Sequence, residues 1–323
     1  MASHLTLEER EAIAHMYRAG KMQTQIAERL GRSKSTISRE LRRNRSRNGY
    51  WAVAADRKAQ TRRSQRPWVG KLERPEVRRY VRERLRQSWS PDQIAGRSHS
   101  DFPRDRRRQI SHQTIYTWIR TEEAAGKHWQ RYLRRLGRKR PDQENRGQMR
   151  ACVSIAGRPA VVDRRSRYGD WEGDTIVGAN HRGGAVTLVE RKSGYLLLGK
   201  VPNLQAATVR QAAAQRYRST PAVLRKTLTL DNGKEFAEHD QLAEEAALKV
   251  YFAKPYCAWQ RGTNENTNGL IRQFFPKGTD LANIPEHRFI KVQHLLNNRP
   301  RKRLGYRTPN EVLASRLQVA IET

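Results

Sequence analysis

Hydrophobic and polar positions follow two different patterns along this chain of 323 residues. Up to about residue 150, apolar side chains recur at intervals of three or four positions, which indicates amphipathic helices. Beyond that point, short apolar runs of the strand type are separated by Gly, Pro and Asn, with helical segments between and after them. The chain is therefore expected to hold several domains, with an all-helical beginning and a mixed α/β end.

Three short helices are expected at the N-terminus. Thr6 can cap a helix over 7–19 that starts with acidic residues, as the helix dipole favours. A second helix covers 24–30, and after a turn at Gly31 a third segment, 33–41, begins with a capping serine. This arrangement is typical of a helix-turn-helix, whose last helix enters the major groove of DNA.

The last of these helices has an apolar and a basic face. At about 100° per residue, Ile37 and Leu41 point toward the core. The opposite face carries the expected DNA contacts, which are Ser35, Thr36, Arg39, Arg42 and Arg43. A three-helix protein-interaction bundle is the alternative, and the basic outer face favours DNA.

A second unit of the same kind is expected further along. Ser90 and Pro91 open a short helix, and Ser111 caps another over 112–120. The outward residues of the latter are further expected DNA contacts, namely Gln113, Thr114, Thr117 and Arg120. The basic loop 101–108 is longer than a standard turn, so a plain helical hairpin remains the alternative.

These patterns divide the chain into five parts. We expect a helix-turn-helix domain (1–48), a basic helical connector (49–87), a second helix-turn-helix-like region (88–133), a basic linker (134–160) and an α/β domain (161–323). The connector is rich in Arg and Ala, and it either follows DNA phosphates or is a solvated charged helix. In the α/β domain, strands are expected over 185–190, 195–201, 227–230 and 249–253, and helices over 205–217, 239–247, 264–275 and 286–297.

The charge of the chain bears on the kind of partner that it binds. It holds 65 Lys and Arg against 32 Asp and Glu, a formal net charge of +33. Residues 1–150 carry 38 basic and 16 acidic residues, a net of +22, and residues 151–323 carry 27 and 16, a net of +11. Such an excess indicates a polyanionic partner that is held mainly by the first part. On charge alone, a structural RNA-coating protein is the alternative.

Three classes of protein are excluded by the composition. The chain has no run of about 20 apolar residues for a membrane span. The first ten residues lack the apolar segment of a secretory signal. The two cysteines, Cys152 and Cys257, are too few for a disulfide framework or a Cys-rich zinc site. We therefore expect a soluble intracellular protein.

Three acidic segments stand out in the α/β part. The run 170–177 places Asp170, Glu172 and Asp174 on one face of a strand. Asp231 directly follows an apolar strand and precedes an Asn-Gly turn, at the strand end where α/β sheets place their chemistry. A later helix presents Glu265, Asn268 and Arg272 on one face.

Carboxylates on a strand, a strand end and a helix suit a reaction of phosphodiesters that depends on metal ions. Two divalent ions can activate an oxygen nucleophile and stabilise a leaving oxygen in phosphodiester exchange. Hard ions such as Mg²⁺ prefer carboxylate oxygens to His or Cys. Each acid taken alone is more often a surface group, and the combination of three favours the metal-dependent reaction.

The order Asp174, Asp231, Glu265, with 33 residues between the last two, resembles the D,D-E triad of retroviral-integrase-like transposases. The strings at 171–176, 229–236, 261–272 and 275–280 are similar to the insertion sequence 30 family of bacterial transposases. The family's two helix-turn-helix regions are also recognisable: residues 26–41 resemble the first, and residues 90–97 with 110–116 resemble the second. The segment 297–311 resembles the family's C-terminal segment. The resemblance covers nearly the whole chain.

The resemblance implies an RNase H-like catalytic domain, a mixed five-stranded sheet with flanking helices. Asp174 would lie on the first strand, Asp231 after the fourth and Glu265 on a later helix, and all three would bind two Mg²⁺ ions, which Mn²⁺ can replace. Water would free a 3′-hydroxyl at an end of the element, and this hydroxyl would attack another phosphodiester. The family's usual route passes through a circular or abutted-ends intermediate and needs no nucleotide cofactor.

The remaining polar residues of the matched strings are expected to support this site. Glu172, Asn232, Asn268 and Arg272 are candidates for orienting the triad or approaching DNA. Asn232 could instead serve only its turn, and Arg272 a structural salt bridge. Asp170 is expected at the surface or near DNA.

The expected partner is double-stranded DNA, both the terminal inverted repeats of the element and the target. Two ends must be held at once, so a homodimer or higher oligomer is expected on DNA, in the bacterial cytoplasm at the nucleoid and away from membranes. A non-catalytic DNA-binding regulator and a metal nuclease without strand transfer are the alternatives. The intact triad disfavours the first, and the two helix-turn-helix units disfavour the second.

Overall fold

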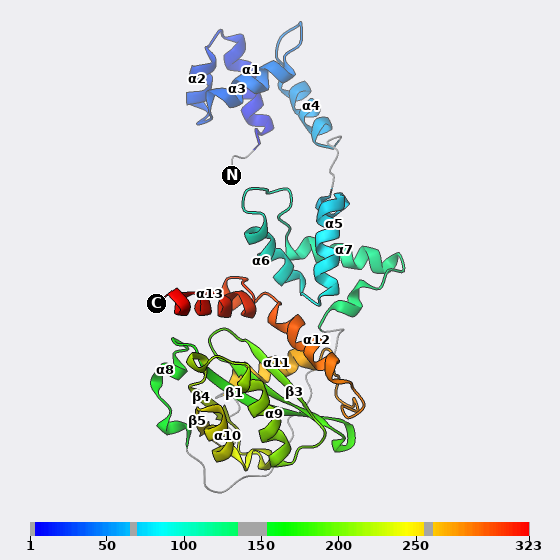
Figure 1. Cartoon of the computed structure of the whole chain (residues 1–323). Coiled ribbons are helices and arrows are strands. Elements are labelled where there is room, and N and C mark those ends of the chain that lie inside the picture. Colours follow the sequence, from blue (N-terminus) through cyan, green and yellow to red (C-terminus); the bar gives the residue numbers. More distant parts are fainter. Residues whose placement is uncertain (1–3, 65–69, 135–153, 255–260, 323) are drawn as a thin grey trace. The chain divides into compact units, whose positions relative to one another are not determined.

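The computed structural model describes residues 4–64, 70–134, 154–254 and 261–322. The chain divides into two compact units, Met1–Gly70 and Lys71–Thr323 (Figure 1). No helix in the described part of the chain combines the length and the apolar character that crossing a bilayer requires.

The first unit is the expected helix-turn-helix, extended by one helix. Its helices are α1 (Leu7–Arg18), α2 (Gln23–Arg29), α3 (Lys34–Asn44) and α4 (Ala52–Ser64). Thr6 caps α1 in a reciprocal bond with Glu9, and Ser33 accepts the amide of Thr36 to cap α3. Gly31, at φ 60°, makes the left-handed turn between α2 and α3 that a side chain would strain.

A buried ion network closes this unit. Arg10 is 3% exposed, and its guanidinium contacts Glu40 at 2.9 Å and Asp56 at 2.8 Å. The hydroxyl of Tyr50 donates to Glu40 at 3.0 Å, and burial raises the pKa of Tyr50. Arg10, Glu40 and Asp56 belong to α1, α3 and α4, so α4 is part of this unit and not of a free connector.

The second unit begins with three helices around one apolar cluster. They are α5 (Pro75–Arg86), α6 (Pro91–Asp101) and α7 (His112–Ala124). Ser90 and Ser111 cap α6 and α7 as expected. The buried cluster joins all three helices and consists of Leu72, Val77, Val81, Leu85, Trp89, Ile94, Ile110, Ile115, Ile119 and Trp129. The segment 49–87 is therefore divided, because α4 packs in the first unit and α5 in this one.

The sheet of the second unit has five strands in the order β3-β2-β1-β4-β5. They are β1 (Asp170–Val177), β2 (Gly184–Glu190), β3 (Leu196–Val201), β4 (Thr227–Leu230) and β5 (Lys249–Phe252). The first three pair antiparallel, and β4 and β5 run parallel to β1. This mixed arrangement confirms the RNase H-like sheet that the sequence resemblance implied.

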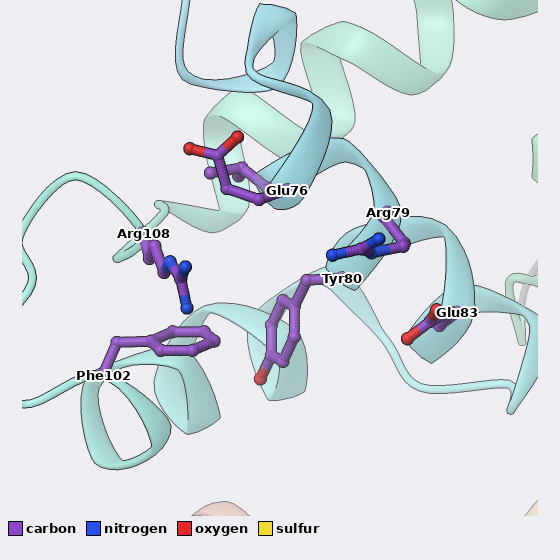
Figure 2. Close-up of a pocket in the computed structure, with 7 residues that line it drawn as sticks. Glu76, Arg79, Tyr80, Glu83, Phe102 and Arg108 are labelled. Atoms are coloured by element: carbon purple, nitrogen blue, oxygen red, sulfur yellow. The ribbon is translucent and has the colours of Figure 1, made fainter.

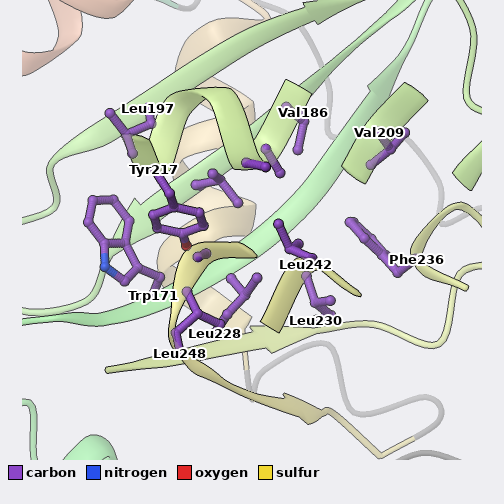
Figure 3. Close-up of a cluster of buried hydrophobic side chains, with 14 of the residues drawn as sticks. Trp171, Val186, Leu197, Val209, Tyr217, Leu228, Leu230, Phe236, Leu242 and Leu248 are labelled. Atoms are coloured by element: carbon purple, nitrogen blue, oxygen red, sulfur yellow. The ribbon is translucent and has the colours of Figure 1, made fainter. Parts of the chain in front are cut away.

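Helices cover both faces of the sheet. On one face α9 (Ala206–Arg218) and α10 (His239–Ala246) pack over Trp171, Leu228 and Leu230 (Figure 3). Leu270 and Ile271 of α11 (Gly262–Ile271) and Phe289 of α12 (Glu286–Asn297) cover the other face. Because strand side chains alternate, Trp171 of β1 faces the first layer and Glu172 faces the second.

An arginine joins the three-helix part to the C-terminal helix α13 (Pro309–Glu322) within this unit. The guanidinium of Arg97 in α6 forms two parallel bonds with Glu311, at 2.6 and 2.7 Å, and a third with Asp101 at 2.7 Å. Tyr306 lies against Gly96, where an added Cβ would meet its ring at 2.3 Å. The hydrogen bonds from Arg97 lower the pKa of Glu311 from 4.5 to about 2.

This pKa shift predicts a pH-dependent contribution to stability. A carboxyl whose pKa is lowered by folding stabilises the protein above its unfolded pKa and loses that effect as the pH falls. The melting temperature of the native protein should exceed that of Glu311→Gln at neutral pH, and the difference should shrink as the pH falls below 4.5 toward the folded value of about 2. Thermal unfolding across this range measures it, with exposed Glu244→Gln on α10 as control. A difference that does not change with pH would contradict the assignment.

Candidate active site

Asp174 and Asp231 come from neighbouring parallel strands. The register pairs Glu172 of β1 with Thr229 of β4, so the residues two positions later, Asp174 and Asp231, fall side by side. A backbone amide holds one oxygen of each carboxylate. The amide of Thr175 donates to Asp174 Oδ1 at 2.8 Å, and that of Gly233 donates to Asp231 Oδ1 at 3.3 Å.

The guanidinium of Arg261 bridges the other oxygens of the two aspartates. Its Nη2 lies 3.1 Å from Asp231 Oδ2, and its Nη1 lies 3.7 Å from Asp174 Oδ2. Nη1 also donates to the carbonyl oxygen of Gly173 at 3.3 Å. The side chains of Arg261, Asp174 and Asp231 are 14%, 16% and 21% exposed, so the cluster is mostly buried but still reaches solvent.

Helix α11 runs past this cluster. Arg261 stands directly before the helix, Glu265 lies one turn later on an exposed face, and Asn268 follows in the next turn. The side-chain amide of Asn268 donates to Asp174 Oδ2 at 2.8 Å, so this face of α11 contacts the aspartate. Within the described residues, no three acidic, His or Cys side chains lie close enough to hold an ion together. The structure thus brings Asp174 and Asp231 together through Arg261, whereas Glu265 is exposed on α11 and, among the described residues, makes no hydrogen bond or ion pair with either aspartate.

Buried polar contacts fix α11 to the sheet. Glu172 is fully buried, its Oε1 lies 2.9 Å from Arg191 Nη1, and its Oε2 accepts the backbone amide of Asn264 at 2.8 Å. The side-chain amide of Asn264 donates to the carbonyl oxygens of Glu172 at 2.8 Å and Thr187 at 3.1 Å. Asn264 thus binds to β1 and β2 at once, which sets the position of Glu265 one residue later.

Asp170 is not at the surface, and that expectation was wrong. Its side chain is 1% exposed and accepts two bonds from Arg167, both of 2.9 Å. Thr227 on the neighbouring strand donates to it at 2.8 Å. The alternation of the strand places Asp170 on the same face as Asp174, but this end of β1 is covered, so the charge is paired inside the protein.

Two of the expected supporting residues make structural contacts. Asn232 donates to the carbonyl oxygen of Ala253 at 2.9 Å and so joins the chain after β4 to the chain after β5. Arg272 donates to the carbonyl oxygen of Val177, at the end of β1, at 3.1 Å. Asn232 therefore links two neighbouring chain segments, and the guanidinium of Arg272 lies against the last residue of the strand that carries Asp174.

The expected DNA-contact residues lie on the outer faces of α3 and α7. Ser35, Arg39, Arg42 and Arg43 are exposed on α3, as are Gln113, Thr117 and Arg120 on α7. Thr36 and Thr114 are half-buried, because their hydroxyls lie 2.8 Å from the capping serines of their helices, Ser33 and Ser111.

Two hollows in the second unit lie away from the aspartates. One of about 190 Å³ is lined by α5 and by Phe102 and Arg108 (Figure 2). The Arg108 guanidinium lies 5.3 Å from the Phe102 ring centre, and Tyr80 meets that ring edge-on at 5.2 Å. The other, of about 700 Å³, includes Arg97 and Glu311. Neither is lined by an acid of the expected triad.

Sequence reasoning missed the roles of Arg191 and Arg261. Arg261 lies in the matched string 261–272, four residues before Glu265, and this spacing corresponds to one helical turn. That spacing was a usable signal for Arg261. The partner of Arg191 depends on strand pairing, which no local pattern specifies.

Comparisons with known proteins find relatives over nearly the whole chain. A helix-turn-helix domain family matches residues 2–44. The transposase for insertion sequence element IS4351 of Bacteroides fragilis is 39% identical over 96% of this chain and 95% of its own. Transposase InsI for insertion sequence element IS30A of Escherichia coli K12 is 41% identical over 96% and 83%. The transposase for IS1086 of Cupriavidus metallidurans is 41% identical over 90% and 88%.

Among solved structures, the catalytic core domain of BIV integrase matches with a TM-score of 0.39 and 18% identity. That match covers 48% of this chain and 99% of the other.

The buried pair of Glu172 and Arg191 leads to a stability prediction. Glu172→Gln keeps the shape of the side chain but leaves the buried guanidinium without its counter-charge. Breaking a buried pair in this way costs about 3–5 kcal/mol. Urea unfolding should therefore show a much lower midpoint for Glu172→Gln and no change for the exposed Glu244→Gln. Equal midpoints for the two variants would mean that the pair does not stabilise the fold.

Proposed function

This chain belongs to the insertion sequence 30 family of transposases, and from that premise we propose that it cuts and joins DNA at the ends of an insertion sequence with divalent metal ions. It is a D,D-E transposase enzyme that binds DNA. The observation that carries the proposal is the convergence of Asp174 and Asp231 beside the helix of Glu265. The terminal inverted repeats of the element are the proposed binding sequence.

The residues of this site suit a hard divalent cation. The donors are carboxylates, and a cationic side chain already lies between two of them. We assign Asp174, Asp231 and Glu265 as catalytic residues that hold two Mg²⁺ ions, for which Mn²⁺ can substitute. When bound, the ions supply charge stabilisation for the reacting phosphate and activate its oxygen nucleophile.

The other residues of the site keep these carboxylates in place. Asn268 orients Asp174 by its hydrogen bond to Oδ2, and Asn264 fixes the helix that carries Glu265. The proposed reaction has two steps. Water attacks a phosphodiester at the end of the element and releases a 3′-hydroxyl, which then attacks a second phosphodiester. One bond forms as another breaks, so no nucleotide cofactor is needed, and the route passes through a circular or abutted-ends intermediate.

Recognition of the ends is assigned to the two helix-turn-helix units. The exposed basic residues of α3 and α7 suit contacts to base edges and phosphates in a major groove. Because transposition joins two ends, the active complex is proposed to be a homodimer or a higher oligomer. Sedimentation of a protein–DNA complex with a single protomer on a pair of ends would contradict this.

The assignment of the triad predicts separable catalysis and binding. Asp174→Asn and Asp231→Asn should abolish new 3′ ends and joined products, because the amide lacks the charge that the ions require. Their affinity for DNA should stay within about twofold of the native protein. Sequencing gels of linear DNA with the element's ends, with Mg²⁺ or with EDTA, measure the first effect. Cleavage without joining would indicate a nuclease, and specific binding without cleavage a regulator.

The basic face of α3 predicts a loss of specific DNA binding. Arg39→Ala should weaken binding to the inverted repeat by about tenfold or more, the effect of removing one base contact of roughly 1–3 kcal/mol. Lys21→Ala, an exposed cation in the loop between α1 and α2, is the control. Fluorescence anisotropy at several salt concentrations measures both, since phosphate contacts make affinity fall with salt. An Arg39→Ala protein that binds like the control would remove α3 from the interface.

A further inference from the structure

Both carboxylates of the aspartate pair are arranged in the same way. The Oδ1 atom of each accepts a backbone amide from its own strand or turn, and the Oδ2 atom of each faces Arg261. The local backbone therefore orients the side chains so that two Oδ2 atoms converge on one point. The guanidinium of Arg261 lies at that point, and the side-chain amide of Asn268 also donates to Asp174 Oδ2.

A guanidinium and a divalent ion need the same oxygen atoms. The guanidinium of Arg261 donates to Asp231 Oδ2 at 3.1 Å and lies 3.7 Å from Asp174 Oδ2, so its charge offsets the repulsion between the two carboxylates. A hard divalent ion also requires carboxylate oxygens and carries a like charge. The two cations repel each other, so the ion can bind these Oδ2 atoms only as the guanidinium leaves them.

The anchoring of α11 lets the guanidinium leave without moving the helix. Arg261 stands at the N-terminal boundary of α11, and Asn264, three residues later, is bound to both β1 and β2. Glu265 and Asn268 follow that anchor. A rotation of the Arg261 side chain therefore frees the aspartates while the rest of the helix keeps its place.

We propose that Arg261 is a built-in counter-cation that pairs Asp174 with Asp231 in the metal-free protein and competes with the divalent ion for their Oδ2 atoms. The inference rests on the proposed function, because it takes these aspartates as metal ligands. Its consequence is a site whose two negative charges are partly compensated before the ion arrives, at the expense of affinity for the ion.

Metal binding by the full-length protein tests this competition without any measurement of activity. Isothermal titration with Mn²⁺ should give a dissociation constant about tenfold lower for Arg261→Gln than for the native protein, because the lost ion pairs no longer oppose the metal. Arg261→Lys keeps the charge but not the planar guanidinium, and its dissociation constant should lie between those of the native protein and Arg261→Gln. Arg218→Gln, at the exposed end of α9, is the matched control and should bind Mn²⁺ like the native protein.

Stability without metal gives the second readout. In EDTA, Arg261→Gln should melt about 2–4 °C below the native protein, because the aspartates lose their counter-charge. Arg261→Lys should recover part of this loss. Mn²⁺ should stabilise Arg261→Gln more than it stabilises the native protein.

The failure of this inference differs from the failure of the proposed function. If Arg261→Gln binds Mn²⁺ no more tightly than the native protein while Asp231→Asn loses Mn²⁺ binding, the aspartates hold metal and Arg261 does not compete. If neither the native protein nor Arg261→Gln binds Mn²⁺, the metal assignment and this inference both fail.

Discussion

The carboxylate of Glu172 fixes the catalytic part of this protein. It is fully buried on the central strand, where a charge is tolerated only with a partner. Arg191 supplies the counter-charge, and the first turn of α11 supplies a backbone amide, at the helix end where the dipole favours an anion. The same carboxylate thus holds the sheet together and sets where α11 begins. The positions of Glu265 and Asn268 follow from that start.

The acids of the central strand differ in exposure rather than in their type of partner. Asp170 pairs with Arg167, Glu172 with Arg191, and Asp174 is approached by Arg261. The first two acids are closed off from solvent and act in the fold. Asp174, like Asp231, stays partly exposed, with 16% and 21% of their side chains reached by solvent.

The helical half is organised by packing more than by its charge. Segment 49–87 carries one basic pattern, yet Asp56 of α4 completes the buried network of the first unit and α5 packs with α6 and α7. Arg97 then binds α6 to the C-terminal helix, so the three helices α5 to α7 belong to the same unit as the sheet. Helix α3, which carries the first set of expected DNA contacts, belongs to the other unit.

Local sequence patterns predicted most elements of the fold, and the family resemblance predicted the triad. Apolar alternation located the later four strands to within two residues, and serine caps located α3, α6 and α7, because both signals are local. The matched strings added the family and singled out Asp174 over Asp170. Only the tertiary structure decided what each acid contacts. Strand register and helix docking determine these contacts. They bury Asp170, pair Glu172 with Arg191 and place Arg261 between two aspartates. They bring together residues that are far apart in the sequence, 92 positions in the case of Glu172 and Asn264, and no local pattern encodes such contacts.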